Sequence, residues 1–505
     1  MSRSRIRMSA LPVVLALLVV ACGQKPGVHV ESGPVAGGQP THDDGMGESV
    51  AAPTDDEFAV DTGDGDGGAE VGADGGDAGV HADAGGGDGA ATDSGGSGDS
   101  GGSGGGNGEA AQQADEGDGN GDEDGGGGTR QPQGSDRTGV TDDSLTVAVH
   151  APVTGAAPLP STSFEQAGDL YWRWLVEEEG GDVLGRTNVE AIFADDRYEP
   201  SAARQVCRQL ADRAFLVTGG GGTDQIQACG QLAAQIRVPY FSAGVTEAGL
   251  EDNPWYFASS MTYRQQGPLL AEMVASRFGD AKTAAIITQT PNFDDAVSGW
   301  EQGVQEHGVN YHQTLRHPRG DTSWYSGFAN QLGDAGVEVV YILTTPLDYI
   351  RFAQVSEDQG HDFQFVGVGV SMGLNAVLNS GCPTVDGGIF FSPFPSLDVI
   401  DDLDPNFNRA AERFGTPNDD LALAIWGASK GLHHLLDAYG ETFGNDLTRE
   451  DFRALVESSG RSETGIFPPV EYRPDDHFGG RAVHVLEADC SVERHRDGGT
   501  FVTGF

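Results

Sequence analysis

A run of four glycines between an apolar stretch and a helical pattern is the feature of the sequence most suggestive of chemistry. The residues "AFLVTGGGG" (214–222) end an apolar run, and Thr223 begins a stretch with helical spacing. Glycines between a strand and a helix N-terminus allow backbone N–H groups to approach an anion closely. We therefore expect an anion-binding loop here.

The residues around this loop do not support nucleotide binding. A P-loop ends in Gly-Lys-Ser/Thr, whereas Gly222 runs directly into Thr223, and no lysine occurs between Lys25 and Lys282. The stretch "GVGVSMG" (367–373) is one residue too long for a dinucleotide-binding fingerprint. We interpret it as a turn after a buried strand.

No pattern in the sequence indicates catalysis or a metal site. There is no HExxH or CxxC motif. His433 and His434 are adjacent on a predicted helix, so they do not share a face. Asp195 and Asp196 follow a predicted strand, where paired aspartates are typical of a turn. We predict a protein that is not an enzyme, with no catalytic residue, metal or cofactor.

The elements that would position the glycine loop alternate between strand and helix. In the first half, strands are expected at 145–152, 188–194, 214–219 and 238–244. The pattern restarts with strands expected at 283–290, 337–345, 363–370 and 387–394, before a long amphipathic helix at 419–440. Such alternation predicts an α/β fold with two doubly wound parallel-sheet lobes and a central cleft. We assign 140–256 and 388–430 to the N-terminal lobe, and 257–387 and 431–505 to the C-terminal lobe.

Ligands of open α/β sheets bind beyond the carboxyl ends of the strands. The residues that follow the predicted strands are therefore the candidate ligand contacts. In the first lobe they are small residues and hydroxyls: Thr154, Gly155, Gly220, Gly221, Thr223, Ser242, Gly244 and Thr246. In the second lobe they are Phe293, Thr345 and Ser371.

Several stretches in this order resemble a known family. They are "APVTG", "FADDRYEPSAARQVCRQL", "VTGGGGTDQIQAC", "VPYFSAGVT" and "FPPVEYRPDDHFGGRAVHVLE". Together they make residues 145–486 similar to the leucine/isoleucine/valine-binding type of periplasmic binding protein, the extracytoplasmic receptors of ABC importers. The resemblance implies the type I fold, with two lobes that are linked by three crossings and close on a small ligand.

The resemblance also implies residue roles. Members that bind amino acids hold the α-carboxylate with the loops matching "GGGGT" and "SAGVT", here Gly220, Gly221, Thr223, Ser242, Gly244 and Thr246. Those members place an acid after the strand matching "FQFVGVGV" to hold the ammonium group, but here the stretch "VGVSMGLN" has Ser371 and no acid. The aromatic residue matching their ligand clamp is Phe293, which has no hydroxyl. Since an unpaired ammonium group is costly in a closed cleft, we expect a carboxylate without an amine, an amide or a larger apolar acid rather than a branched-chain amino acid.

The expected function is that of a solute-binding protein. The chain would capture a small carboxylate-bearing ligand (an amino acid, an amide or another organic acid) between its lobes and deliver it to an ABC permease. The alternative is a cell-surface sensor or adhesion module that uses the same fold without transport. The formal net charge of −48 makes nucleic acid a poor partner.

The N-terminus has the pattern of an export signal. Residues 1–21 carry Arg3, Arg5 and Arg7 before an apolar run too short to span a bilayer. "VVAC" resembles a bacterial lipobox, which predicts cleavage before Cys22 and a lipid anchor on its thiol in the bacterial cell membrane. The alternative is an ordinary signal peptide followed by an incidental cysteine.

Residues 22–139 have the composition of a disordered tether. Between residues 26 and 129 there is no lysine or arginine, and 24 residues are Asp or Glu. A chain made mostly of Gly, Asp, Ala and Ser cannot bury enough apolar surface to offset the entropy of ordering. We expect a spacer between the membrane and the lobes, with an acidic tail that binds a basic partner as the alternative.

Four cysteines follow Cys22, and an even number in an exported chain favours two disulfides. Three pairings are possible. We expect Cys207–Cys229 and Cys382–Cys490, because the first two cysteines fall on consecutive predicted helices that should lie side by side. Zinc binding is the less favoured use of these cysteines.

Overall fold

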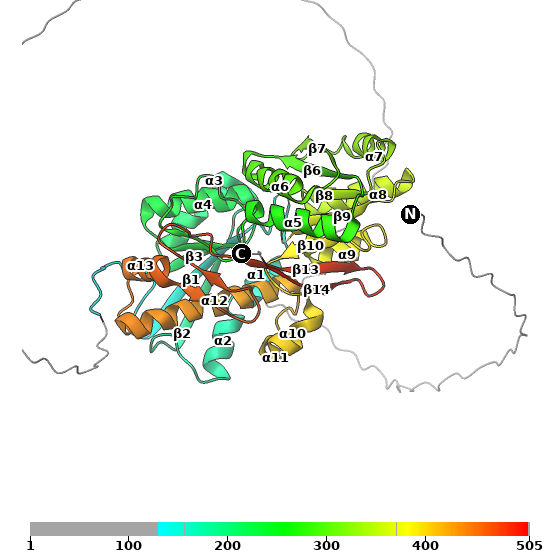
Figure 1. Ribbon diagram of the computed structural model, residues 1–505. Coiled ribbons are helices and arrows are strands. Elements are labelled where there is room, and N and C mark those ends of the chain that lie inside the picture. Colours follow the sequence, from blue (N-terminus) through cyan, green and yellow to red (C-terminus); the bar gives the residue numbers. More distant parts are fainter. Residues whose placement is uncertain (1–129, 156, 370, 503–505) are drawn as a thin grey trace, which may run out of the picture. The chain divides into compact units, whose positions relative to one another are not determined.

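The computed structural model describes residues 130–155, 157–369 and 371–502 (Figure 1). The predicted signal peptide, Cys22 and most of the predicted tether lie outside the described residues. The last part of that predicted tether, residues 130–139, is described and is attached to the folded part of the chain. The N–H groups of Gln133 and Gly134 donate to the Asp451 carboxylate at 3.0 and 2.7 Å, and Asp136 forms an ion pair with Arg449. The folded region therefore begins about ten residues earlier than predicted.

The first sheet has the strand order β2-β1-β3-β4-β5 and is parallel throughout. Its strands are β1 (Ser144–Ala151), β2 (Asn188–Asp195), β3 (Leu216–Gly219), β4 (Tyr240–Ser242) and β5 (Tyr256–Ala258). The helices between them are α1 (Ser161–Ala167), α2 (Leu170–Glu177), α3 (Pro200–Ala211) and α4 (Thr223–Ile236). Pro200 occupies the first position of α3, where its missing N–H is not needed.

The second sheet has the order β14-β13-β10-β9-β8-β6-β7. Its parallel strands are β6 (Thr283–Gln289), β7 (Tyr311–Pro318), β8 (Val339–Leu343), β9 (Gln364–Val368) and β10 (Ile389–Ser392). The antiparallel pair β13 (Ala482–Asp489) and β14 (Arg494–Val502) completes one edge. The connecting helices are α5 (Tyr263–Phe278), η1 (Pro291–Phe293), α6 (Asp294–His307), α7 (Tyr325–Asp334), α8 (Pro346–Asp358), η2 (Ser371–Gly373) and α9 (Asn375–Gly381). The predicted α/β fold with two doubly wound sheets is confirmed.

After β10 the chain returns to the first sheet. The returning elements are η3 (Leu397–Val399), α10 (Ile400–Leu403), α11 (Pro405–Phe414), α12 (Asp420–Phe443), α13 (Arg449–Ser459), β11 (Arg461–Ser462) and β12 (Val470–Glu471). Buried side chains of α12 and α13, including Trp426 and Phe452, share one core with Trp172 and Phe215 of the first lobe. Figure 1 shows α12 and α13 beside β1 and β3.

Two predicted lobe boundaries therefore need correction. The predicted change of lobe at residues 430/431 falls inside α12, which is one continuous helix. Residues 389–392, predicted to lie in the N-terminal lobe, form β10, which pairs with β9 and β13 of the second sheet. The reason is that β10 is buried at every position and apolar at all but Ser392, so it needs a neighbour on each side. We propose that residues 397–471 belong to the first lobe.

In the described part of the chain, three connections join the sheets, at residues 259–262, 393–396 and 472–481. The first and third lie against each other. The Ala258 N–H donates to the His477 carbonyl at 3.0 Å, and a Cβ on Gly480 would lie 2.2 Å from the Met261 nitrogen. A side chain at position 480 would push the two connections apart.

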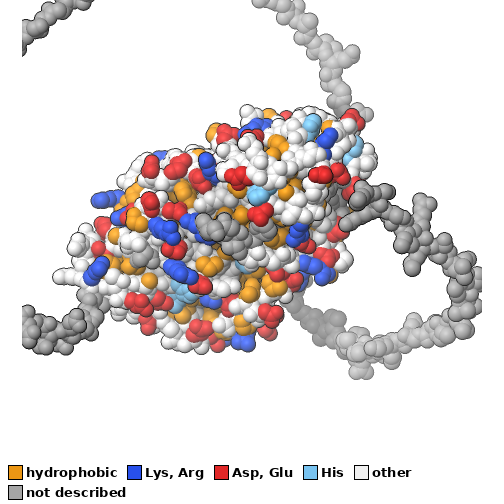
Figure 2. Space-filling model, in the orientation of Figure 1, with side chains coloured by type: hydrophobic (Ala, Val, Ile, Leu, Met, Phe, Trp, Pro, Cys, Tyr) orange, Lys and Arg blue, Asp and Glu red, His pale blue; other side chains and the backbone are white. Residues whose placement is uncertain are grey.

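The structure contains both expected disulfides. Cys207–Cys229 links α3 to α4, and Cys382–Cys490 links the end of α9 to the turn between β13 and β14. One disulfide lies in the first lobe and the other lies in the second lobe. Within the described residues, no helix is both long enough and apolar enough to span a bilayer. On the face shown in Figure 2, acidic and basic side chains are interspersed.

Candidate functional site

The glycine loop leads into the N-terminus of α4 as the sequence predicts. Gly222 is the N-cap residue, with φ +78°, and no side-chain cap hydrogen bond is described there. A Cβ on Gly222 would lie 2.2 Å from Oε1 of Gln225, so both conformation and space require glycine. The first N–H groups of a helix have no partner within the helix itself. This helix end is therefore suited to an anion.

Gln225 in the first turn of α4 is fully buried, and its amide has no hydrogen-bond partner among the described residues. A buried side-chain amide without partners destabilises the folded state, because both its NH2 group and its carbonyl oxygen lose the hydrogen bonds that they make to water. Its position beside Gly222 places this unsatisfied group at the same helix end as the glycine loop. Sequence reasoning missed Gln225. The available signal was its position three residues after the N-cap, where Glu and Gln side chains often reach back to the start of the helix.

The first turn of α4 faces the second lobe. The Asp224 carboxylate accepts hydrogen bonds from Thr290 (3.0 Å) and Asn292, on either side of the start of η1. It also forms an ion pair with Arg319, 2.7 Å away, at the end of β7. The Arg319 guanidinium lies over the ring of Tyr198, 5.1 Å from its centre. These contacts hold loops of both sheets together beside the α4 N-terminus.

Three of the predicted first-lobe donors are already engaged within the chain. The Gly220 N–H donates to the His150 carbonyl at 2.7 Å, and the Gly244 N–H donates to the Ser260 hydroxyl at 2.9 Å. The Ser242 hydroxyl lies 3.0 Å from both the Ala243 carbonyl and the Tyr256 hydroxyl.

The loop at Thr246 holds a carboxylate of the protein itself. Asp295, in the first turn of α6, accepts hydrogen bonds from the Thr246 hydroxyl at 3.2 Å and the Glu247 N–H at 2.7 Å. Burial raises the pKa of Asp295 despite these hydrogen bonds. A side chain of the second lobe thus occupies the place where a ligand carboxylate was expected.

The loop at Thr154 and Gly155 also surrounds a carboxylate of the chain. Asp195 accepts from the Thr154 hydroxyl and from the N–H groups of Val153 (3.1 Å), Thr154 (3.3 Å) and Arg197 (2.9 Å). Burial acts to raise the pKa of Asp195, but these hydrogen bonds outweigh it and the pKa is lowered. Gly155 (φ +96°) touches the Arg197 carbonyl, which a Cβ would approach to 2.0 Å.

The predicted second-lobe residues whose side chains are described have contacts within their own lobe. Thr345 caps α8, where its hydroxyl accepts from the Asp348 N–H at 3.2 Å. Phe293 is buried and packs against Tyr263 of its own lobe, with ring centres 6.3 Å apart. The side chain of Ser371 lies outside the described residues. Of the predicted residues, Gly221 and Thr223 flank the N-cap residue Gly222 and are the closest to Gln225 along the chain.

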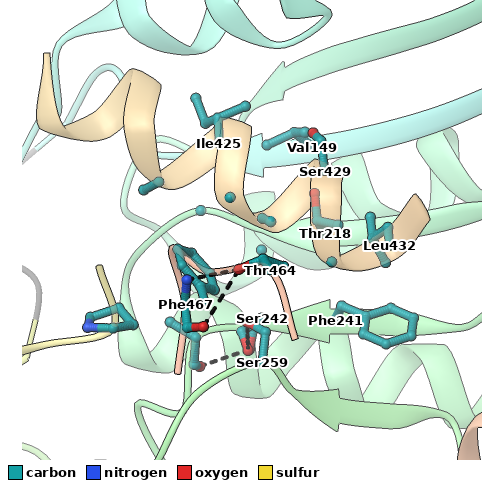
Figure 3. Close-up of a pocket in the computed structure, with 18 of the residues that line it drawn as sticks. Val149, Thr218, Phe241, Ser242, Ser259, Ile425, Ser429, Leu432, Thr464 and Phe467 are labelled. Atoms are coloured by element: carbon teal, nitrogen blue, oxygen red, sulfur yellow. Dashed lines mark hydrogen bonds between the residues drawn. The ribbon is translucent and has the colours of Figure 1, made fainter. Parts of the chain in front are cut away.

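Sequence reasoning also missed a pocket of about 130 Å³. It lies between the carboxyl-terminal halves of β1, β3 and β4 on one side and α12 on the other (Figure 3). Among the predicted site residues, Gly220 and Ser242 line it. The signal in the sequence is the stripe of small residues on α12, namely Ala424, Gly427, Ala428 and Gly431, where larger side chains would fill the space.

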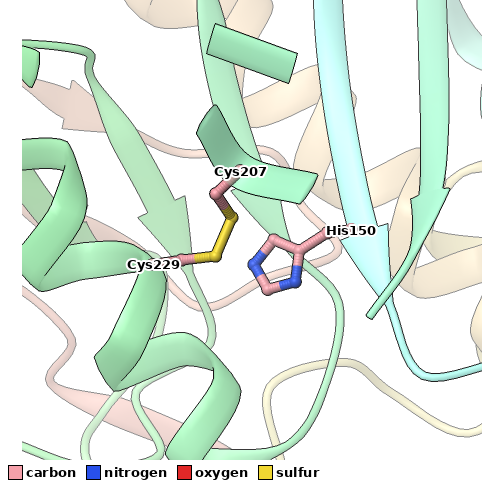
Figure 4. Close-up of side chains that lie close together, drawn as sticks. All are labelled: His150, Cys207 and Cys229. Carbon is pink, nitrogen blue, oxygen red and sulfur yellow. A yellow bond between two sulfur atoms is a disulfide. The ribbon is translucent and has the colours of Figure 1, made fainter. Parts of the chain in front are cut away.

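One group of potential metal ligands is occupied by other bonds (Figure 4). His150 lies close to Cys207 and Cys229, but the two sulfurs are joined in a disulfide. The His150 ring nitrogens are 2.7 Å from the Asp196 carboxylate and the Tyr240 hydroxyl. Both nitrogens are engaged, so this group is a structural cluster of the first lobe.

The sequence profile of the periplasmic binding proteins matches residues 144–498. The chain belongs to the periplasmic binding protein family. No curated protein matches the sequence. The predicted leucine/isoleucine/valine-binding type is confirmed. The family consists of extracytoplasmic solute-binding proteins.

Similar solved structures support the same fold at low sequence identity. A fatty acid ABC transporter substrate-binding protein from Thermomonospora curvata is 18% identical, with a TM-score of 0.59, covering 73% of this chain and 94% of that one. A branched-chain amino acid ABC transporter protein from Thermus thermophilus with bound valine is 16% identical, with a TM-score of 0.61 and coverages of 72% and 98%. A solute-binding protein from Rhodopseudomonas palustris in complex with 3,4-dihydroxybenzoic acid is 18% identical, with a TM-score of 0.58 and coverages of 71% and 98%.

Proposed function

We propose that this periplasmic binding protein captures a small carboxylate-bearing solute at the boundary of its two lobes and delivers it to an ABC permease. The solute carboxylate would accept hydrogen bonds from the first turn of α4, from the backbone around Gly221 and Thr223 and from the Gln225 amide. The unsatisfied, fully buried Gln225 carries this proposal, because a bound carboxylate would supply the acceptor that its amide lacks.

The solved relatives are consistent with a carboxylate ligand. Valine and 3,4-dihydroxybenzoic acid, present in two of those structures, both contain a carboxyl group, as do the fatty acids named for the third. All three belong to ABC transporters, which supports the permease as partner. The lipid anchor at Cys22 and the tether would keep the protein at the membrane surface near that permease.

The mechanism that we propose is binding without turnover. The solute docks on the α4 N-terminus of the first lobe, and the contacts of Asp224 with Thr290, Asn292 and Arg319 hold the second lobe over it. Because a ligand shifts a conformational equilibrium only by its differential affinity, the solute must contact both lobes to favour the closed state.

The test is a thermal-shift screen of the purified chain against a panel of small carboxylic acids and their amides. A ligand at 100 times its Kd should stabilise the folded state by about 2.7 kcal/mol, which shifts the midpoint of unfolding measurably. A folded protein that shows no shift with any carboxylate would contradict the proposal.

Gln225→Leu gives a second, residue-specific test. Leucine has a similar size and no polar atoms, so the unliganded variant should be at least as stable as the native chain, while the shift caused by the acid is lost. Gln235→Leu, at the exposed far end of α4, is the matched control and should retain the shift. Equal shifts in both variants would remove Gln225 from the site.

A further inference from the structure

Residues 290–295, between the end of β6 and the first turn of α6, contact two loops of the first lobe. At one end of this segment, Thr290 and Asn292 donate hydrogen bonds to the Asp224 carboxylate in the first turn of α4. At the other end, Asp295 reaches into the loop that follows β4. One short segment of the second lobe therefore donates to a first-lobe carboxylate and also supplies a carboxylate to first-lobe donors.

The loop after β4 surrounds the Asp295 carboxylate as it would surround a bound anion. The Thr246 hydroxyl donates to it at 3.2 Å, and the Glu247 N–H donates at 2.7 Å. Thr246 is fully buried and Asp295 is 9% exposed, so water has little access to this contact. Hydrogen bonds to a carboxylate are roughly twice as strong as those between neutral groups. The contact joins the two lobes through the protein's own groups.

The packing of α6 against α5 fixes the position of Asp295 in the second lobe. A Cβ on Gly299 would lie 2.1 Å from the Arg264 carbonyl oxygen, and one on Gly303 would lie 2.5 Å from the Cα of Pro268. The backbones of α5 and α6 are therefore in direct contact, which leaves α6 little freedom to shift. Because Asp295 is carried by a rigid helix, little conformational freedom is lost when it meets the first lobe.

We propose that Asp295 is a built-in ligand of the first lobe and that, together with the contacts of residues 290–292 to Asp224, it closes the lobes without a solute. The unliganded protein is then predominantly closed. A solute enters from the open minority and adds its own contacts to a closed state that the protein already populates. The inference concerns the control of lobe closure, so it goes beyond the proposed solute and does not depend on the proposed site at α4.

The test measures the separation of the lobes in the purified chain without a solute. Spin labels attached to a genetically encoded keto amino acid at Glu199 and Thr322 leave the cysteines unmodified. Both side chains are exposed, and they flank the contact between Tyr198 and Arg319 of opposite lobes. Double electron–electron resonance should show mainly the label separation of the closed structure. A native chain that is mainly open would overturn the inference.

Asp295→Ala should shift the chain toward the open form. It removes the acceptor of two hydrogen bonds, so the ratio of closed to open molecules should fall at least about tenfold, since one hydrogen bond to a charged group contributes about that factor. Asp294→Ala is the matched control, because Asp294 is in the same helical turn but is exposed and pairs with Arg316 of its own lobe, 2.9 Å away. Equal distance distributions in the two variants would overturn the inference.

Formate tests whether the loop after β4 recognises the carboxylate itself. In Asp295→Ala, added formate should take the vacated place and restore the closed separation, whereas sodium chloride at the same ionic strength should not. The restoration should persist when Gln225→Leu is added, because that substitution alters the proposed solute site and leaves this loop intact. If formate has no effect in Asp295→Ala, the loop does not hold Asp295 as a ligand and the inference is wrong.

Thr246→Val provides a second test if Asp295→Ala does not fold. Valine has the shape of threonine without the hydroxyl, so one of the two hydrogen bonds to Asp295 is lost from the opposite lobe. The ratio of closed to open molecules should fall, by less than in Asp295→Ala, and an unchanged ratio would contradict the inference. Since the spin-label measurements contain no solute, their failure would leave the proposed carboxylate site at α4 standing.

Discussion

At the scale of single residues, the structure contains buried ionisable groups whose burial disfavours the charged form. Asp420, in the first turn of α12, is almost completely buried and accepts the N–H of Asn375 at the start of α9. Burial raises the pKa of Asp420 to about 6. His495 contacts the same Asn375, and burial lowers the pKa of His495 to about 4. The two groups therefore have opposite effects on stability in acid.

Asp420→Asn should stabilise the protein at neutral pH. The pKa of Asp420 is higher in the folded state than in the unfolded state, so the folded state binds the proton more tightly. The destabilisation caused by burying the ionised carboxylate is therefore absent below pH 4 and complete above pH 6. Removing the charge should raise the free energy of unfolding at pH 7.5 by roughly 1 to 3 kcal/mol, with a smaller gain at pH 5. Urea unfolding at both pH values measures this. His495 is present in both the variant and the native chain, so its contribution cancels when their free energies of unfolding are compared. An equal gain at both pH values would contradict the prediction.

At the scale of elements, Gly222 at the junction of β3 and α4 combines a positive φ with a close contact to a neighbouring side chain. Gly222 has φ +78° and lies against the Gln225 amide. Gly308, at the end of α6, has φ +67°, and a Cβ placed on it would have open space around it. Both glycines have a positive φ, but only Gly308 is in the left-handed α region, and only Gly222 lacks space for a side chain.

Gly222→Ala should therefore destabilise the protein more than Gly308→Ala. The left-handed α conformation of Gly308 costs a non-glycine residue roughly 1 to 2 kcal/mol. Gly222, with φ +78° and ψ +112°, lies outside that region, so alanine there incurs at least as large a backbone cost. The alanine at 222 must also displace Gln225, so its loss should be larger by on the order of 1 kcal/mol or more. Urea unfolding of the two variants gives the comparison, and equal losses would show that Gln225 moves without cost.

At the scale of the whole molecule, the two disulfides restrain chain segments of very different length. Cys207 and Cys229 are 22 residues apart, whereas Cys382 and Cys490 are 108 apart. The longer loop loses more conformational freedom in the unfolded chain when it is closed. Disulfides of this kind are typical of exported proteins, in agreement with the family.

Removing the disulfide at 382 and 490 should cost more than removing the other. In the chain-entropy account, alanine at both positions of the longer loop should lower the free energy of unfolding by about 1 kcal/mol more than alanine at 207 and 229. Calorimetric unfolding of the two double variants tests this. The reverse order would indicate that packing around the sulfurs outweighs loop entropy.

The sequence by itself determined the strand and helix alternation, the glycine run before α4 and the family. These features depend on local patterns, since periodicity and turn residues act within a few positions of the chain. The order of the elements then predicted two sheets.

Only the tertiary structure decided which groups remain free to bind. Whether Gly220 can donate depends on His150, and Asp295 reaches Thr246 from 49 residues away. The lobe in which α12 packs, the unsatisfied Gln225 and the pocket beneath α12 are likewise products of long-range packing. A hydrogen-bond partner or an empty space is defined by every neighbour at once, and those neighbours come together only when the chain has folded.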